Sequence, residues 1–143
     1  MKGMLRRLVF ASLLILSGCA VFAPSGDDLY RNLGSEAGIS AIVDAFLHEL
    51  AGNERVLPLF ANTDIERFRE KLIEQLCDTA GGPCTYSGDS MRDVHRGMQI
   101  SRAQFNSVVE DLIRAMQREQ VPVAAQNELL RRLAGMYGDI VHL

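Results

Sequence analysis

The chain has 143 residues and carries 15 Lys and Arg against 18 Asp and Glu, a formal net charge of −3 with neutral histidines. An acidic chain repels the phosphates of DNA and RNA, so nucleic acid is excluded as a partner. The length fits one domain with a short appended segment.

The N-terminal segment has the features of a secretory signal. Lys2, Arg6 and Arg7 form a basic start, and Leu8–Leu16 is an apolar run too short to cross a bilayer as a permanent helix. All 18 acidic residues follow this segment, so its removal leaves a more acidic domain. We therefore predict a signal peptide at residues 1–18.

The end of this signal, LSGC at residues 16–19, resembles a bacterial lipobox. In such signals the cysteine, here Cys19, is acylated and becomes the mature N-terminus, and more than one acyl chain gives firm anchoring. An ordinary signal peptide and a chance cysteine are the alternatives. Residue 20 is Ala rather than Asp, so by analogy with bacterial lipoproteins we expect the outer membrane, facing the periplasm. Residues 19–26 would be the lipidated N-terminus and a tether, and residues 27–143 the domain.

Beyond the tether, apolar residues recur at intervals of three and four, which predicts helices almost throughout. The predicted helices begin near residue 36, at the capping-box patterns of Thr63, Ser90 and Ser101, and at Pro122. The last of them carries apolar residues as far as position 141. Only residues 120–124 alternate, weakly, as a strand would. The sequence therefore predicts an all-α domain.

Two further cysteines, Cys77 and Cys84, stand at the ends of the stretch CDTAGGPC. The Gly-Gly-Pro turn lets their thiols approach, and the periplasm is oxidising. A disulfide across so short a loop contributes about 2.5 kcal/mol in the chain-entropy treatment, less any strain. A redox pair normally has C-x-x-C spacing, and a zinc pair needs further ligands nearby. We favour a structural disulfide, and a redox pair, a metal pair and free thiols stay open.

Residues 78–89 carry no strong helical signal, and a loop this long needs a partner to rest on. A bound prosthetic group would be such a partner. Just beyond the loop, the stretch MRDVHRGM contains His95, the one histidine in the central part of the chain. Neutral imidazole is a good axial ligand of haem iron, whereas the plain alternative is a surface histidine on a short helix.

The order of these motifs resembles the group 1 truncated haemoglobins. The likeness spans residues 28–141 and needs no insertion or deletion between the motifs, which are LYRNLG, Phe46, PLF at 58–60, GGPCTYSG at 81–88, MRDVHRGM and ISRAQF. The family has a shortened globin fold, a sandwich of two helices over two. The resemblance therefore implies a globin-like all-α domain that binds haem b, iron protoporphyrin IX.

The resemblance also implies roles for particular residues. In the family the histidine of the M-[KR]-x-x-H segment is the proximal iron ligand, which corresponds to His95, and its other N–H should be held by a backbone carbonyl. Phe60 matches the aromatic residue that packs on the macrocycle. The other predicted pocket residues, for which simple core packing is the alternative, are Phe46, Leu47, Phe68, Leu72, Val94, Met98, Ile100, Phe105, Val109 and Leu133. The basic residues expected near the haem propionates, or on a solvated face, are Arg67, Lys71 and Arg92. His48 and His142 are given no role.

The distal side departs from the family's usual pattern. Three positions that commonly supply Tyr or Gln read Leu47, Phe68 and Leu72, and none of these donates a hydrogen bond. A donor to bound dioxygen is worth roughly 1–3 kcal/mol, so its absence predicts fast oxygen release and easy oxidation of the iron, with a smaller effect on carbon monoxide. Gln75, about one turn beyond Leu72, is the nearest donor that could swing in.

Three functions follow from these observations. The first is reversible binding of a diatomic ligand (O2, NO or CO), or electron transfer with an unidentified donor, at the periplasmic face of the membrane. The second is a globin fold without cofactor that acts as a binding module, because a large side chain such as Phe68 tends to fill an empty cavity. The third is nitric oxide dioxygenase or peroxidase-like catalysis, which normally needs a polar distal group.

Overall fold

The computed structural model describes residues 26–142, so the predicted signal peptide, Cys19 and residues 20–25 of the tether lie outside the described range. Gly26, which we expected in the tether, is the first residue of a helix. The elements in chain order are α1 (Gly26–Asn32), α2 (Ser35–Gly52), the 3-10 helix η1 (Leu57–Phe60), α3 (Ile65–Thr79), α4 (Met91–His95), α5 (Arg102–Arg118), α6 (Val123–Leu133) and the 3-10 helix η2 (Ala134–Asp139). Residues 26–142 contain no strand, which confirms the all-α prediction.

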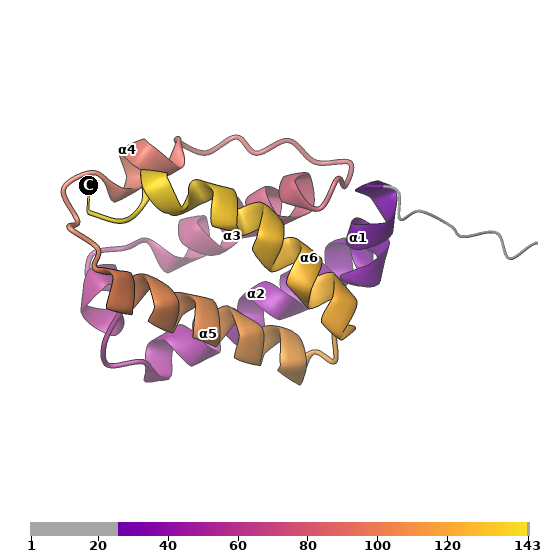
Figure 1. The fold of residues 1–143 in the computed structure, drawn as a ribbon, viewed down its shortest axis with the longest axis horizontal. Coiled ribbons are helices and arrows are strands. Elements are labelled where there is room, and N and C mark those ends of the chain that lie inside the picture. Colours follow the sequence, from indigo (N-terminus) through magenta and orange to yellow (C-terminus); the bar gives the residue numbers. More distant parts are fainter. Residues whose placement is uncertain (1–25, 143) are drawn as a thin grey trace, which may run out of the picture.

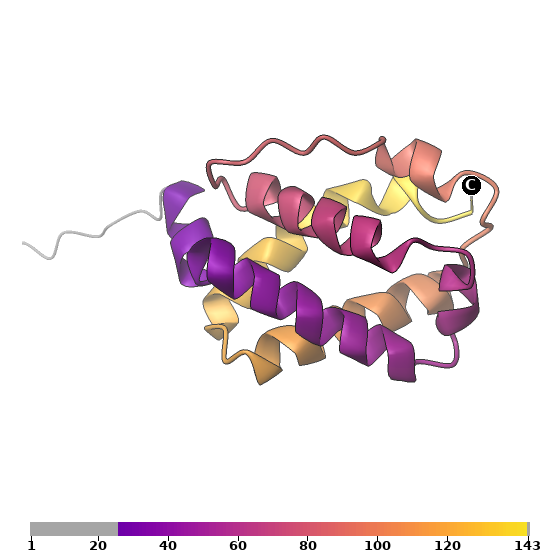
Figure 2. The same cartoon turned by 180° about the vertical axis from the view of Figure 1, so that it is seen from behind.

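The central helix is α2, and both α5 and α3 pack on it. Figures 1 and 2 show α2 with α3 on one side of the molecule and α5 with α6 on the other. α1 closes one end by packing on α2 and α6. The largest apolar side chains that are fully buried, which together form the centre of the core, are Ile39, Ile42, Val43, Val56, Leu76, Met116 and Leu129.

The corner between α1 and α2 depends on two glycines. Gly34 has a φ of 88°, in the left-handed region that glycine adopts without steric cost. Gly38 lies so close to the preceding helix that a Cβ at this position would overlap the carbonyl oxygen of Leu33. This corner turns α2 back along the molecule and leaves α1 against α6.

The predicted helix starts are largely confirmed. Ser101 and Gln104 form a complete capping box at the start of α5, and the Ser90 side chain accepts a hydrogen bond from the Asp93 N–H at the start of α4. The prediction for α3 is wrong by one residue. Its N-cap is the neighbouring Asp64. The Asp64 carboxylate accepts a hydrogen bond at 3.1 Å from the Arg67 N–H, which has no acceptor within the helix.

The predicted last helix is wrong in its second half. α6 ends at Leu133, and the chain continues as the tighter 3-10 helix η2. Two glycines, Gly135 and Gly138, lie in this segment and lower its helix propensity. The tighter turn lets the backbone of Val141 reach Ile100, with which it forms an isolated parallel bridge.

The connection from α3 to α4, residues 80–90, is called the strap below. It has no helix and runs along one edge of the molecule in both views (Figures 1 and 2). A disulfide joins Cys77, in the last turns of α3, to Cys84 in the strap, with 5.8 Å between the two Cα atoms. Among residues 26–142, no helix combines the length and the hydrophobicity that a membrane crossing requires.

Truncating Leu129 to alanine tests the packing of the core. Leu129 is fully buried, so Leu129→Ala is expected to lower the free energy of unfolding by about 2–5 kcal/mol. Val123→Ala, in the same helix but at a side chain that is 69% exposed, should change it by less than about 0.5 kcal/mol. Urea unfolding followed by circular dichroism measures both. Equal losses in the two variants would contradict the arrangement of α6.

Candidate functional site

His95 is the last residue of α4, and its half-buried ring has a fixed orientation. The ring Nδ1 lies 2.7 Å from the carbonyl oxygen of Met91, one turn earlier in the helix. A carbonyl oxygen only accepts hydrogen bonds, so Nδ1 carries the proton and the lone pair of the neutral ring lies on Nε2. The helix therefore presents one imidazole nitrogen, in one tautomer, as a donor to a metal.

The predicted distal residues Leu47, Phe68 and Leu72 lie along the edge of the core on α2 and α3, and Phe60 of η1, predicted to pack on the macrocycle, lies with them. They are half-buried, and each packs on the edge of the hydrophobic core: Leu47, Phe60, Phe68 and Leu72. The rings of Phe60 and Phe68 lie with their centroids 5.3 Å apart. This wall is apolar throughout, as the sequence predicts, and it offers no hydrogen-bond donor.

A second group of predicted residues lies on the other side of the site. Met98, Phe105 and Val109 are also half-buried, but unlike the distal group they do not pack on the core. The Phe105 ring contacts Tyr137 of η2 edge to face, with 4.9 Å between centroids. Leu133 lies at the end of α6 and packs on the core. Apolar side chains that are left half-buried in this way mark a surface that a ligand can cover.

Three predicted pocket residues stand apart from these two groups. Phe46 is buried in the core on α2. Ile100 is buried at its bridge with Val141. Val94 is 48% exposed, because α4 has little more than one turn and little packs on its outer side.

The Gln75 side chain does not turn toward Leu72. Its Nε2 lies 3.1 Å from the sulfur of Met91 and 3.5 Å from the sulfur of Met136, so it reaches from α3 to α4 and η2. Thioethers are weak acceptors. Sequence reasoning missed both methionines as site residues, although Met91 precedes His95 by one helical turn and so lies on the same face.

Two of the three predicted propionate partners already have anionic partners. Lys71 is half-buried, and its Nζ lies 2.8 Å from a Glu74 carboxylate oxygen. Arg92 is exposed and forms an ion pair of 2.8 Å with Asp139. Arg67 is exposed in the first turn of α3. A haem propionate that bound Lys71 or Arg92 would have to replace these carboxylates.

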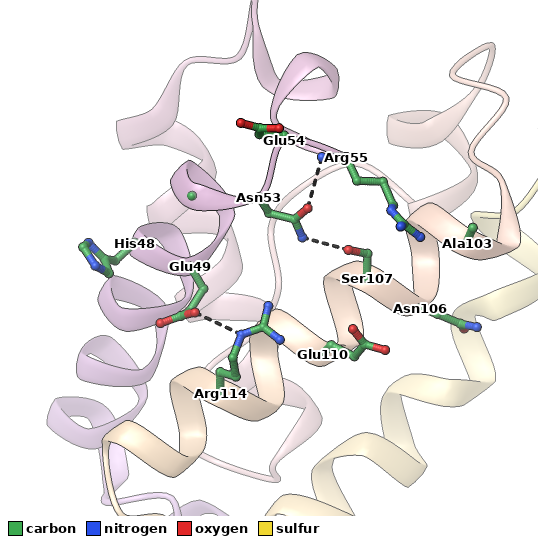
Figure 3. A pocket seen from close by; sticks show the side chains of 11 residues that line it. His48, Glu49, Asn53, Glu54, Arg55, Ala103, Asn106, Ser107, Glu110 and Arg114 are labelled. Carbon is green, nitrogen blue, oxygen red and sulfur yellow. Dashed lines mark hydrogen bonds and ion pairs between the residues drawn. The ribbon is translucent and has the colours of Figure 1, made fainter.

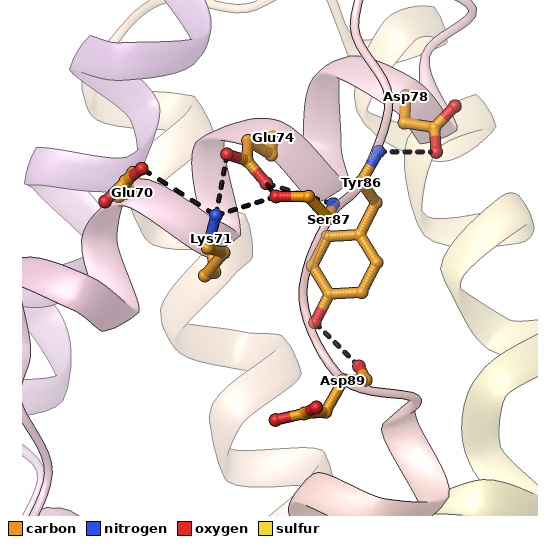
Figure 4. Close-up of polar contacts among 7 residues, drawn as sticks. All are labelled: Glu70, Lys71, Glu74, Asp78, Tyr86, Ser87 and Asp89. Carbon is orange, nitrogen blue, oxygen red and sulfur yellow. Dashed lines mark hydrogen bonds and ion pairs between the residues drawn. The ribbon is translucent and has the colours of Figure 1, made fainter.

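Glu74 also fixes the strap to α3 (Figure 4). Its second carboxylate oxygen accepts hydrogen bonds from the Ser87 N–H at 3.1 Å and from the Ser87 hydroxyl at 2.8 Å. The Lys71 ammonium, together with these two donors, lowers the pKa of Glu74 to about 2 from its usual 4.5. The carboxylate is therefore charged, and its contacts are intact, at neutral pH.

A large hollow on the described surface lies away from these residues. It is a polar groove of about 910 Å³ between the end of α2 and the first half of α5 (Figure 3). Inside it, Arg114 pairs with Glu49 at 3.1 Å, and Asn53 donates to Ser107 at 2.8 Å. His48 is exposed and lies among the residues that line the groove. The groove contains none of the predicted pocket residues, and Glu49, Asn53, Ser107 and Arg114 within it are already paired with one another.

A smaller hollow of about 530 Å³ is lined only by apolar residues of α2, η1 and the start of α3. It shares Leu47 and Phe60 with the distal wall. The candidate site is therefore identified by the types of its residues and not by the volume of a hollow. It consists of His95 and the apolar residues described above, two of which also line the smaller hollow.

Comparison with known proteins agrees with this fold. A family model described as bacterial-like globin matches residues 28–142. The group 1 truncated haemoglobin of Tetrahymena pyriformis is 31% identical over 100 residues, which cover 70% of this chain and 83% of the relative. The group 1 truncated haemoglobin of Nostoc commune is 28% identical and covers 80% of this chain and 97% of its own.

Solved structures show the same architecture. The crystal structure of truncated haemoglobin from Tetrahymena pyriformis, in its Fe(III) form, has a TM-score of 0.78 at 28% identity and covers 80% of this chain and 98% of that chain. A 2/2 haemoglobin from Synechococcus, solved with covalently attached haem, has a TM-score of 0.74; at 24% identity it supports the fold alone. The predicted two-over-two globin fold is confirmed. The chain therefore belongs to the bacterial-like globin family, as one of its group 1 truncated haemoglobins.

Protonation of Glu74 should weaken the protein in acid. A carboxyl whose pKa is lower in the folded state stabilises the fold above its unfolded pKa, and this stabilisation is lost as the pH falls from about 4.5 toward 2. Glu74→Gln is expected to flatten the pH dependence of the thermal midpoint in that window, measured by circular dichroism. Glu119→Gln, at an exposed residue after α5, is the control. Superposable profiles for wild type and Glu74→Gln would contradict the role of this carboxylate.

Proposed function

We propose that this chain binds haem b, with His95 as the proximal ligand, and binds a diatomic ligand reversibly on the opposite, apolar side. The observation that carries the proposal is the hydrogen bond from His95 Nδ1 to the Met91 carbonyl, because it leaves Nε2 as the free donor and holds the ring in place. The crystal structure of the Tetrahymena relative, which is of an Fe(III) form, supports the binding of an iron-containing group.

The donor set fits haem better than a bare metal ion. Residues 26–142 contain no group of three or more His, Cys, Asp or Glu placed to hold a metal. A porphyrin supplies four nitrogen ligands itself, so a single imidazole completes the attachment. The half-buried apolar residues of the two groups described above fit the flat, apolar macrocycle.

When bound, haem supplies an iron that takes up O2, NO or CO or changes its charge by one electron. The protein's own residues then have simple tasks. His95 would hold the group through Nε2, and Phe60, Phe68 and Leu72 would exclude water from the apolar wall that they form. None of these three donates a hydrogen bond, so we propose ligand binding or electron transfer rather than oxygen chemistry that needs a polar distal group.

We further propose that the domain works at the cell envelope, tethered through acylated Cys19 at the outer membrane and facing the periplasm. The lipobox-like stretch LSGC supports this location. Cys19→Ser should move the protein from the membrane fraction to the soluble fraction, because Cys19 is the residue to which the acyl chains are attached. Fractionation followed by immunoblotting measures the change. Unaltered membrane association would contradict the anchor.

The absorption spectrum tests haem binding. Purified protein mixed with haem is expected to bind one equivalent and to give a Soret band, and His95→Ala should abolish or shift that band, because no other assigned ligand replaces the imidazole. His48→Ala, at an exposed histidine on the groove rim, is the matched control and should leave the spectrum unchanged. An identical spectrum for His95→Ala and wild type would refute the proximal assignment.

Ligand kinetics test the apolar distal wall. Leu72→Gln places an amide donor in this wall and should slow dissociation of O2 from the ferrous protein about ten- to hundredfold, with carbon monoxide changed much less. Leu72→Met, which fills the same space without a donor, is the control. Stopped-flow measurement of both ligands gives the comparison. An equal change for O2 and carbon monoxide would show that size, rather than hydrogen bonding, controls release.

A further inference from the structure

The strap connects the helix of the distal wall to the helix of His95. It leaves α3 after Thr79 and ends at Ser90, which is the N-cap of α4. α4 is short, and the helical element that it packs on is η2. The position of His95 therefore depends on where the strap delivers the start of α4.

One side of α3 holds the strap by four kinds of contact. The residues of α3 that take part are Lys71, Glu74 and the adjacent pair Cys77 and Asp78, which lie three or four positions apart from one turn to the next and so form a single stripe. The contacts, shown in part in Figure 4, are the Cys77–Cys84 disulfide, the Tyr86 N–H to Asp78 at 3.1 Å, the two Ser87 hydrogen bonds to Glu74, and the Lys71 ammonium to the Ser87 hydroxyl at 2.8 Å.

The disulfide is the strongest of these attachments. The polar contacts join groups at the surface, where individual hydrogen bonds and ion pairs contribute little. The disulfide is covalent, and its Cys77 end is buried in the core, 1% exposed. Cutting this bond would leave the strap held only by contacts that solvent can replace.

We propose that the Cys77–Cys84 disulfide is a positioning element for His95, which keeps α4 in the haem-binding position, so that its reduction accelerates haem loss. This inference rests on the proposed function. A strap that is free of α3 gains conformational entropy when haem is absent, and that entropy must be lost again for His95 to reach the iron. Because the disulfide holds the strap on α3 at all times, most of this entropy does not have to be lost when haem binds.

The redox step needs a dithiol as the reductant. A thiolate of the dithiol attacks the half-buried Cys84 sulfur, the Cys77–Cys84 bond breaks, and the Cys77 sulfur leaves and takes up a proton. The second thiol of the reductant then displaces Cys84, which is also protonated, and the reductant becomes a cyclic disulfide. Two electrons pass from the dithiol to the protein disulfide, and the iron takes no part.

Haem transfer to an excess of a scavenging apoglobin tests the proposal. The double variant Cys77→Ser/Cys84→Ser, used without reductant, is expected to release haem about tenfold faster than wild type, as the loss of an eight-residue covalent loop permits. Thr85→Ala, at an exposed strap residue beside Cys84, is the control and should release haem at the wild-type rate. Glu74→Ala, which keeps the disulfide, should give a smaller increase. Equal rates for the double variant and wild type would overturn the inference.

Hydrogen exchange of the haem-free protein gives a readout that does not depend on haem. Amides of residues 85–95 should exchange faster in the double variant than in wild type, while those of α5 stay unchanged. Normal haem uptake with equal protection of residues 85–95 would overturn the positioning role and leave the proposed function standing. Faster exchange without haem uptake by wild type would instead overturn the proposed function, and with it the consequence for haem.

Discussion

The hydrogen bond between His95 Nδ1 and the Met91 carbonyl is the interaction on which the site depends. It exists only because α4 forms, and α4 is too short to form alone. The Ser90 cap supports its first turn, and the strap and η2 support it from outside. The chemistry of one nitrogen atom is therefore set by elements from three parts of the chain.

The molecule separates the part that makes it stable from the part that binds. Fully buried side chains such as Ile42, Met116 and Leu129 come from α2, α5 and α6 and belong to one hydrophobic core. The residues around His95 are half-buried and belong to the periphery of that core. The distal wall packs on this core, which fixes its side chains and so lowers the ordering cost of binding a ligand there.

The fold could be predicted from sequence because its signals are local. Ser101 and Gln104 specify a helix start within four residues, and the apolar stripe of α5 follows directly. The prediction was wrong by one residue where two neighbouring residues could both cap a helix. Thr63 was predicted as the N-cap of α3, and the structure has Asp64 instead. The end of α6 was missed because the apolar stripe continues beyond it. The two glycines of η2, which end the α-helix in the structure, are only a weak signal in the sequence.

Only those parts of the candidate site that depend on the type of a single residue could be predicted from the sequence. His95 and the apolar residues of the distal wall follow from residue type and order. The partners of Gln75 lie on α4 and η2, up to 61 positions away, and no pattern within α3 indicates them. The exposure of Val94 likewise depends on how little packs on a short helix, which is a property of the assembled fold.

Lys71, one of the residues predicted to lie near the haem propionates, forms an ion pair within its own helix. In this structure its ammonium is neutralised by Glu74, a carboxylate of its own helix. A propionate that took this place would exchange one anion for another and would not create a new pair. The lysine would then add little to affinity, and the Glu74 carboxylate would keep its half-buried ammonium balanced by an anion whether or not a propionate is bound.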